Sequence, residues 1–167
     1  MVSDGLLQSV KTKRQAGILL EEIEIIRKGL FEAGEGAMNS LLKNKVRVET
    51  AEIVRETFSK VGVDKKGYLD KVEELIIKMP NVSLILAFEP SEGAVERFYS
   101  EISETTGKQV LLDIVYEPQI IGGAVIIFNG RYRDYSFKKI FKLEFERGRN
   151  KILNMAKERQ ANVNIKH

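Results

Sequence analysis

The sequence predicts an α+β protein with an N-terminal helical bundle, a small β-α-β-β-β domain and a C-terminal helix. Apolar residues recur at helical spacing up to residue 79, and short alternating runs replace this pattern further on. All three prolines lie in the later part, where they separate shorter elements. We therefore expect three parts: a helical bundle at 1–79, an α/β domain at 80–136, and a basic helix and tail at 137–167.

The composition excludes several kinds of chemical site. The chain has 167 residues, 43% apolar and 31% charged, as is usual for a globular protein. It has no cysteine, and its one histidine is the terminal His167, which excludes a thiolate nucleophile, a Ser-His-Asp arrangement and a multi-histidine metal site. No apolar run approaches the ~20 residues of a membrane span, and the N-terminus lacks the apolar core of a secretory signal. The absence of cysteine is compatible with a reducing cytoplasmic setting, and the composition predicts no catalytic or metal site built on cysteine or on an internal histidine.

The net charge of +3 hides an uneven distribution along the chain. Residues 131–167 hold eleven Lys/Arg against four Asp/Glu, whereas residues 1–130 hold sixteen against twenty. A basic segment of this kind is suited to an acidic protein surface, a nucleic acid or an anionic membrane.

The first helix is expected from about Leu6 to Phe31, with Ser3 or Asp4 as its N-cap and a kink or division at Gly17. Its apolar residues between 18 and 31 cover about 240° of the helix surface, more than one neighbouring element needs. The helix is therefore either central in a bundle or covered by a partner on one side. The residues that we name as candidate partner contacts are Ile18, Leu19, Ile23, Ile26 and Leu30.

Three more helices are expected before residue 80. Gly34-Glu35-Gly36 predicts a loop between two helices. It does not predict phosphate binding, because no Gly-Lys-Ser/Thr follows it. A short helix at 37–43 comes next, then a helix at about 49–61 closed by a left-handed Gly62. Asp64 is the expected N-cap of the helix that ends before Pro80.

The second half predicts strand, helix, strand, strand, strand and helix. Strands are expected at 82–88 and 109–117, with a helix between them from Ser91 to Gly107. Asn129-Gly130 between two alternating runs predicts a type I′ hairpin. Ser136 then caps the last helix, whose expected inward residues are Phe137, Ile140, Phe141, Phe145, Ile152 and Met155.

Gly122-Gly123 raises the question of a phosphate-binding turn. Such a turn presents backbone N–H groups at the start of a helix, whereas these glycines lead into the strand-like run AVIIF. Glycines at a strand entrance more often permit a bulge or a close approach of two backbones. We interpret the pair as a geometric feature and not as a nucleotide site.

Several short motifs follow one another within residues 82–140: Thr106-Gly107-Lys108, Glu117-Pro118, Ile121-Gly122-Gly123, Asn129-Gly130, Asp134 and Ser136. Their order resembles the C-terminal domain of the delta subunit of rotary ATP synthases, called the oligomycin-sensitivity-conferring protein in mitochondria. Two features differ from that family: only about 80 residues precede the first strand, and the last helix is longer and more basic.

The resemblance implies a non-catalytic stator subunit of the peripheral stalk, at the cytoplasmic face of the cell membrane. Its partners would be the N-terminal helices of the alpha subunits in the catalytic head and the b subunit of the stalk, without a small-molecule substrate or cofactor. The apolar arc of residues 18–31 is the candidate surface for the first partner. Lys138, Lys139 and Lys142 on the last helix are candidates for the second.

Three alternative functions compete with this one. A nucleic-acid-binding module is suggested by arginines and tyrosines at 131–135, but no ribonucleoprotein or KH motif is present. An enzyme is disfavoured because Asp113 and Glu117, four apart on a strand, are too distant to share a substrate proton. An E-type stalk subunit of a vacuolar or archaeal ATPase would begin with one long charged helix, which the early glycines do not suit.

Overall fold

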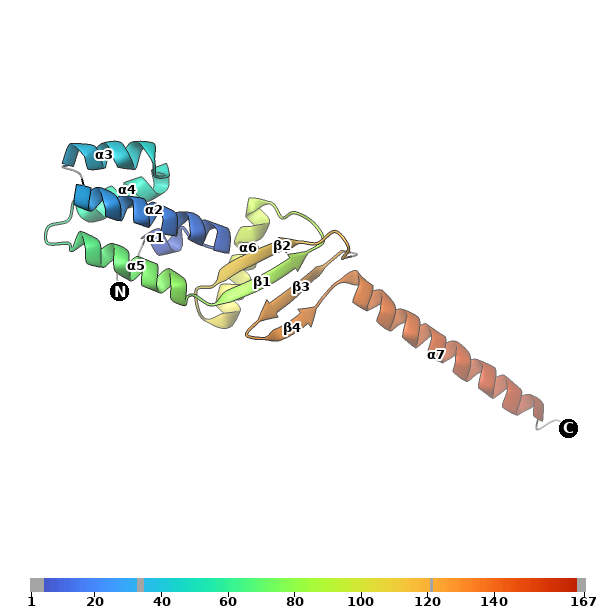
Figure 1. The fold of residues 1–167 in the computed structure, drawn as a ribbon. Coiled ribbons are helices and arrows are strands. Elements are labelled where there is room, and N and C mark those ends of the chain that lie inside the picture. Colours follow the sequence, from blue (N-terminus) through green and yellow to red (C-terminus); the bar gives the residue numbers. More distant parts are fainter. Residues whose placement is uncertain (1–4, 33–34, 121, 165–167) are drawn as a thin grey trace. The chain divides into compact units, whose positions relative to one another are not determined.

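A computed structural model describes the backbone of residues 5–32, 35–120 and 122–164, without the side chains of 32, 35–37, 138, 139 and 156–164. The expected α+β fold and order of elements are confirmed (Figure 1). The chain divides into two compact units: unit 1 comprises residues 1–82 and 91–114, and unit 2 comprises residues 83–90 and 115–167.

Unit 1 contains a bundle of helices with its own apolar core (Figure 1). The helix α2 packs against both α3 and α5, and α1 packs against α4 and α5. Fully buried side chains include Leu6, Leu19, Ile26 and Leu69. The bundle helices are α1 (Gly5–Gln8), α2 (Lys13–Glu32), α3 (Glu35–Asn44), α4 (Val48–Phe58) and α5 (Lys65–Lys78).

The expected helix at 6–31 is divided at residues 9–12 and not at Gly17, which lies inside α2. Thr12 and Gln15 form a capping box at the start of α2. The Thr12 hydroxyl accepts from the Gln15 N–H at 3.2 Å, and the Gln15 side chain accepts from the Thr12 N–H at 3.0 Å. The extended residues before the box pair with a strand, since the Leu112 N–H donates to the Lys11 carbonyl at 2.9 Å. This division also departs from the single long helix that an E-type stalk subunit would need.

The other helix ends of unit 1 follow local signals more closely. The helix α3 begins at Glu35, so the expected loop is shorter and Gly36 is helical. The Asp64 side chain accepts from the Gly67 N–H at 3.0 Å and caps α5, as predicted. Gly62 has a φ of 80°, as expected, although α4 ends earlier, at Phe58.

The four strands form one sheet in the order β2-β1-β3-β4. Leu111 N donates to Pro80 O and Glu117 N donates to Leu86 O, both at 2.9 Å. Both bonds have the same sequence offset, so β1 and β2 run parallel. The strands are β1 (Asn81–Leu86), β2 (Leu111–Tyr116), β3 (Ala124–Phe128) and β4 (Arg131–Asp134).

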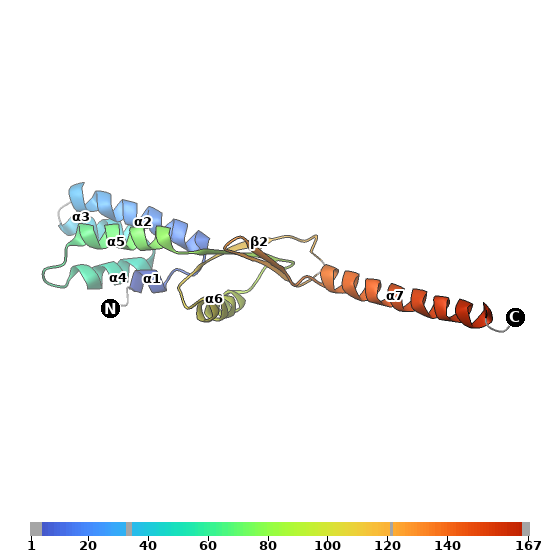
Figure 2. The same cartoon turned by 90° about the horizontal axis from the view of Figure 1, so that it is seen from below.

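The helix α6 (Glu92–Thr106) joins β1 to β2 and lies on one side of β2 (Figure 2). The Ser91 side chain accepts from the Ala94 N–H at 3.3 Å, and Gly107 ends the helix with a φ of 64°, as predicted. The adjacent residues Leu111 and Leu112 of β2 are both buried, although successive side chains of a strand point to opposite faces. Leu111 belongs to the core of the bundle, whereas its buried neighbour Leu112 does not.

Strands β3 and β4 form the predicted hairpin. Their antiparallel register pairs Phe128 with Arg131 and Val125 with Asp134. Asn129 and Gly130 have φ values of 49° and 72°, as a type I′ turn requires. The last helix, α7 (Phe137–Asn164), follows this hairpin.

The expectation that α7 turns apolar residues inward is wrong. Every described side chain from residue 140 to residue 155 is exposed. Periodicity correctly indicated an apolar stripe, but it cannot say what covers the stripe. The exposed members are Phe137, Ile140, Phe141, Phe145, Ile152 and Met155.

Candidate functional site

The double glycine lies where two backbone segments of unit 2 come close together. Gly122 and Gly123 have φ values of 64° and 81°, a region that favours glycine. A Cβ on Gly122 would lie 2.7 Å from Cε2 of Phe137, and one on Gly123 would lie 2.9 Å from Cα of Ser136. A side chain at either position would therefore be unfavourable for two reasons. The backbone has a positive φ, and neighbouring atoms already occupy the place that a Cβ would take.

Hydrogen bonds hold the same junction together. The Gly122 carbonyl accepts from the Phe137 N–H at 3.2 Å, at the first residue of α7. The Asp134 carboxylate accepts from the Ser136 N–H at 2.8 Å, and Ser136 is buried. The residues of the sequence motif thus meet in space and join the entrance of β3 to the start of α7. Ile121 lies outside the described residues.

The candidate partner contacts on α2 divide into two groups. Leu19, Ile23 and Ile26 are buried in the core of unit 1, with at most 1% of each exposed. Ile18 and Leu30 are only half-buried. In this conformation only the second group is open to a partner.

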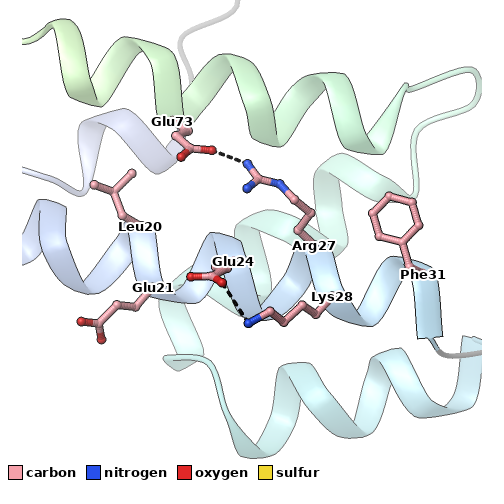
Figure 3. A pocket seen from close by; sticks show the side chains of 7 residues that line it. All are labelled: Leu20, Glu21, Glu24, Arg27, Lys28, Phe31 and Glu73. Atoms are coloured by element: carbon pink, nitrogen blue, oxygen red, sulfur yellow. Dashed lines mark hydrogen bonds and ion pairs between the residues drawn. The ribbon is translucent and has the colours of Figure 1, made fainter.

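A shallow depression lies on the outer side of α2 and next to α5 (Figure 3). Phe31 at its edge is 70% exposed, and the Lys66 Nζ lies 5.9 Å from the centre of its ring. Two apolar side chains, Leu20 and Phe31, line the depression together with five charged ones. The lining residues are Leu20, Glu21, Glu24, Arg27, Lys28, Phe31 and Glu73.

Ion pairs fix the charges around this depression. The Arg27 guanidinium pairs with Glu73 and, at 3.0 Å, with Asp70. The hydrogen bond to Glu73 raises the pKa of Arg27, although burial acts in the opposite direction. Lys28 pairs with Glu24 at 2.9 Å one turn apart on α2 (Figure 3). No local signal in the sequence indicates the Arg27–Glu73 contact, because its residues lie on different helices.

A buried charge cluster nearby stabilises the bundle, and no sequence motif indicates it. The Glu22 carboxylate is only 5% exposed and accepts four hydrogen bonds, three from Arg47 and one from the Thr50 hydroxyl. Burial raises the pKa of Glu22, but the hydrogen bonds from Arg47 and Thr50 together outweigh burial and keep the pKa below its usual 4.5. The cluster ties α2 to the start of α4, which has no side-chain cap of its own at Arg47. We assign it to stability and not to chemistry.

The lysines proposed for partner contact lie on α7. Lys142 is exposed. The side chains of Lys138 and Lys139 lie outside the described part of the structure, so their predicted role stays a prediction. The exposed apolar stripe lies on the same helix as these lysines.

The described residues contain no group of three or more acidic or histidine side chains placed to hold a metal ion. Asp113, weighed as a possible catalytic carboxylate, instead pairs with Lys13 at 3.1 Å. None of the helices in the described ranges is both long enough and apolar enough to cross a membrane.

These features define an α+β protein with exposed apolar and charged surfaces of the kind that bind other proteins. A curated relative, the ATP synthase subunit delta of Desulfosudis oleivorans, is 28% identical to the chain over 99 residues. The relationship to the ATP synthase delta subunit that the motifs predicted is confirmed for this matched part, which is 59% of the chain.

The chain spans about half the length of this relative, with 48% of the relative covered. A chain in a solved structure of the Polytomella F-ATP synthase aligns with a TM-score of 0.38 and 23% identity, covering 46% of this chain and 96% of that one. No family model matches the chain.

Proposed function

We propose that the chain is a non-catalytic stator subunit of a rotary ATP synthase and links the catalytic head to the stalk that anchors the head at the membrane. The observation that carries this proposal is the relationship to an ATP synthase delta subunit. A rotary motor transmits torque only if its head does not turn with the rotor, so the link must be large and slow to dissociate. The subunit would lie at the cytoplasmic face of the cell membrane through its partners.

Two surfaces support the linking role. The depression on α2 and α5 in unit 1 is a candidate for the N-terminal helices of the alpha subunits. The basic helix α7 in unit 2 is a candidate for the stalk b subunit. Its residues 137–164 hold eight Lys/Arg against three Asp/Glu, a net charge of +5 that suits an acidic partner.

Co-purification from membranes tests the proposal. The full chain carries a tag and is captured from detergent-solubilised membranes of its own source, and the captured proteins are identified by mass spectrometry. We expect both an ATPase head and a single-span stalk subunit to be captured. Capture of neither one would contradict the proposal.

Paired variants separate the two surfaces. Phe31→Glu places a charge in the depression and should reduce capture of the head, whereas Val61→Glu alters a fully exposed side chain outside the depression and should not. Lys142→Glu, alone and with reversals at Lys138 and Lys139, should reduce capture of the stalk. Arg131→Glu makes the same charge change in β4 and should leave stalk capture intact. If the two variants of a pair change capture equally, the surface that the pair tests is not the binding surface.

Nucleic-acid binding is a second candidate, favoured by the exposed side chains of Arg131, Tyr132, Arg133 and Tyr135. Tyrosines beside arginines can stack on bases and contact phosphates. Retention on immobilised RNA that falls steeply with salt, and falls again with Arg131→Glu, would support this function. Retention that does not depend on these residues would exclude it.

A further inference from the structure

The helix α7 carries an apolar seam along its surface. Successive seam residues are 4, 3, 4 and 3 positions apart, which is the heptad spacing that keeps one face turned toward a single neighbouring helix. Phe145 is 83% exposed and Ile152 is 68% exposed, so no described part of the chain covers the seam. The seam consists of Phe141, Phe145, Gly148, Ile152 and Met155.

A hollow lies in the middle of the seam, where Gly148 has no side chain. A Cβ added to Gly148 would meet no atom within 4 Å. The walls of the hollow are mainly apolar and lie one turn before and one turn after the glycine. Such a hollow can receive a large apolar side chain from a neighbouring helix, as a hole receives a knob in a coiled coil. It is lined by Phe141, Glu144, Phe145, Gly148, Arg149, Ile152 and Leu153.

The charges beside the seam indicate what kind of helix fits. With Phe141 and Gly148 at d positions, Lys142 and Arg149 occupy the adjoining e positions. We propose that the seam binds an acidic amphipathic helix of another chain, which inserts a large apolar side chain into the hollow at Gly148. Because α7 is the helix proposed to meet the stalk, this inference rests on the proposed function and specifies how the contact is made.

A second copy of the chain and a lipid surface fit the seam less well. In a parallel pair of α7 helices Gly148 would face Gly148, which would leave a void at that layer. In an antiparallel pair the e positions set Lys142 against Arg149 while the g positions set Glu144 against Lys151, so the charges give no net attraction. A lipid surface favours a wholly apolar face, whereas the charged residues Glu144 and Arg149 line the hollow.

Two synthetic peptides test the hollow against the full chain. Each is about three heptads long, with Leu at a and d and Glu at e and g, so that neither pairs with itself. They differ only at one central d position, which holds Trp in one peptide and Ala in the other. We expect the unmodified chain to bind the Trp peptide at least about tenfold more tightly, measured by isothermal titration calorimetry.

Filling the hollow should reverse this preference. Gly148→Leu adds a side chain where no atom lies within 4 Å, and leucine favours a helix more than glycine does, so the variant should fold. We expect it to bind the Ala peptide more tightly than the Trp peptide. Equal affinities for the two peptides, or no binding of either, would overturn the inference.

Seam variants with a matched control complete the test. Phe145→Glu should abolish peptide binding, whereas Asn150→Glu, about 180° round the helix from the middle of the seam, should retain it. If the chain sediments as a dimer and Phe145→Glu makes it monomeric, the inference is overturned. The same holds if phosphatidylglycerol vesicles bind the chain and displace the peptide. If Phe145→Glu still captures both head and stalk from membranes, the seam inference fails while the proposed function stands.

Discussion

Replacing Gly123 by alanine tests the geometric role of the double glycine. The φ of 81° costs a side-chain-bearing residue about 1–2 kcal/mol. The new Cβ would also lie 2.9 Å from the Cα of Ser136 and closer still to the Tyr135 carbonyl, so backbone must move. Overpacking of this kind costs a further ~1–3 kcal/mol. We therefore expect the variant to lose about 2–5 kcal/mol in unit 2.

Gly130→Ala is the matched control. Gly130 has a similar φ of 72°, but a Cβ there would meet no atom within 4 Å, so only the conformational cost of about 1–2 kcal/mol applies. Amide hydrogen exchange followed by mass spectrometry over β3 and β4 reports on unit 2 separately from unit 1. Equal losses of protection in the two variants would refute the close-approach reasoning.

The remaining predictions concern unit 1 and are measured by urea denaturation followed by circular dichroism. Glu22→Gln should cost about 3 kcal/mol, because it breaks a buried ion pair. Because the folded-state pKa of Glu22 is lowered, the stabilisation that its carboxylate provides is complete above pH 4.5 and is lost as the pH falls through the folded-state pKa. The difference in unfolding free energy between this variant and the parent should therefore become smaller in acid. Thr12→Ala should cost about 1 kcal/mol, because the N-cap of α2 is lost. Gly17→Ala should stabilise unit 1 by about 1 kcal/mol, because alanine favours a helix more than glycine does. Gly29→Ala should stabilise it by less, because the Cβ added to Gly29 would lie 2.8 Å from a leucine methyl.

Local signals predicted much of the fold. Asp64 and Ser91 cap their helices as expected, and Asn129-Gly130 forms the hairpin, because each signal acts through atoms within three or four residues. The capping box at Thr12 and Gln15 was equally local, and its Thr-x-x-Gln spacing could have revealed the division between α1 and α2.

Features that join distant residues were not predictable in the same way. The Arg47 contact with Glu22 spans 25 positions, and the pairing of Thr12 with Leu112 spans 100. The stripe on α7 was found, but its inward orientation was wrong, since amphipathicity shows that a face is apolar and not which chain covers it. The role of Gly123 in backbone geometry was predictable from the sequence, because the residues that follow it predict a strand and not the helix that a phosphate-binding turn needs.

Rebinding of the catalytic head to stripped membranes tests the linking role most directly. Membranes are depleted of the head and of this chain, and purified head is returned with or without the chain while sedimentation measures how much head the membranes retain. The account predicts that head is retained when the chain is present and is lost when the chain is omitted. Equal retention in both conditions would contradict it.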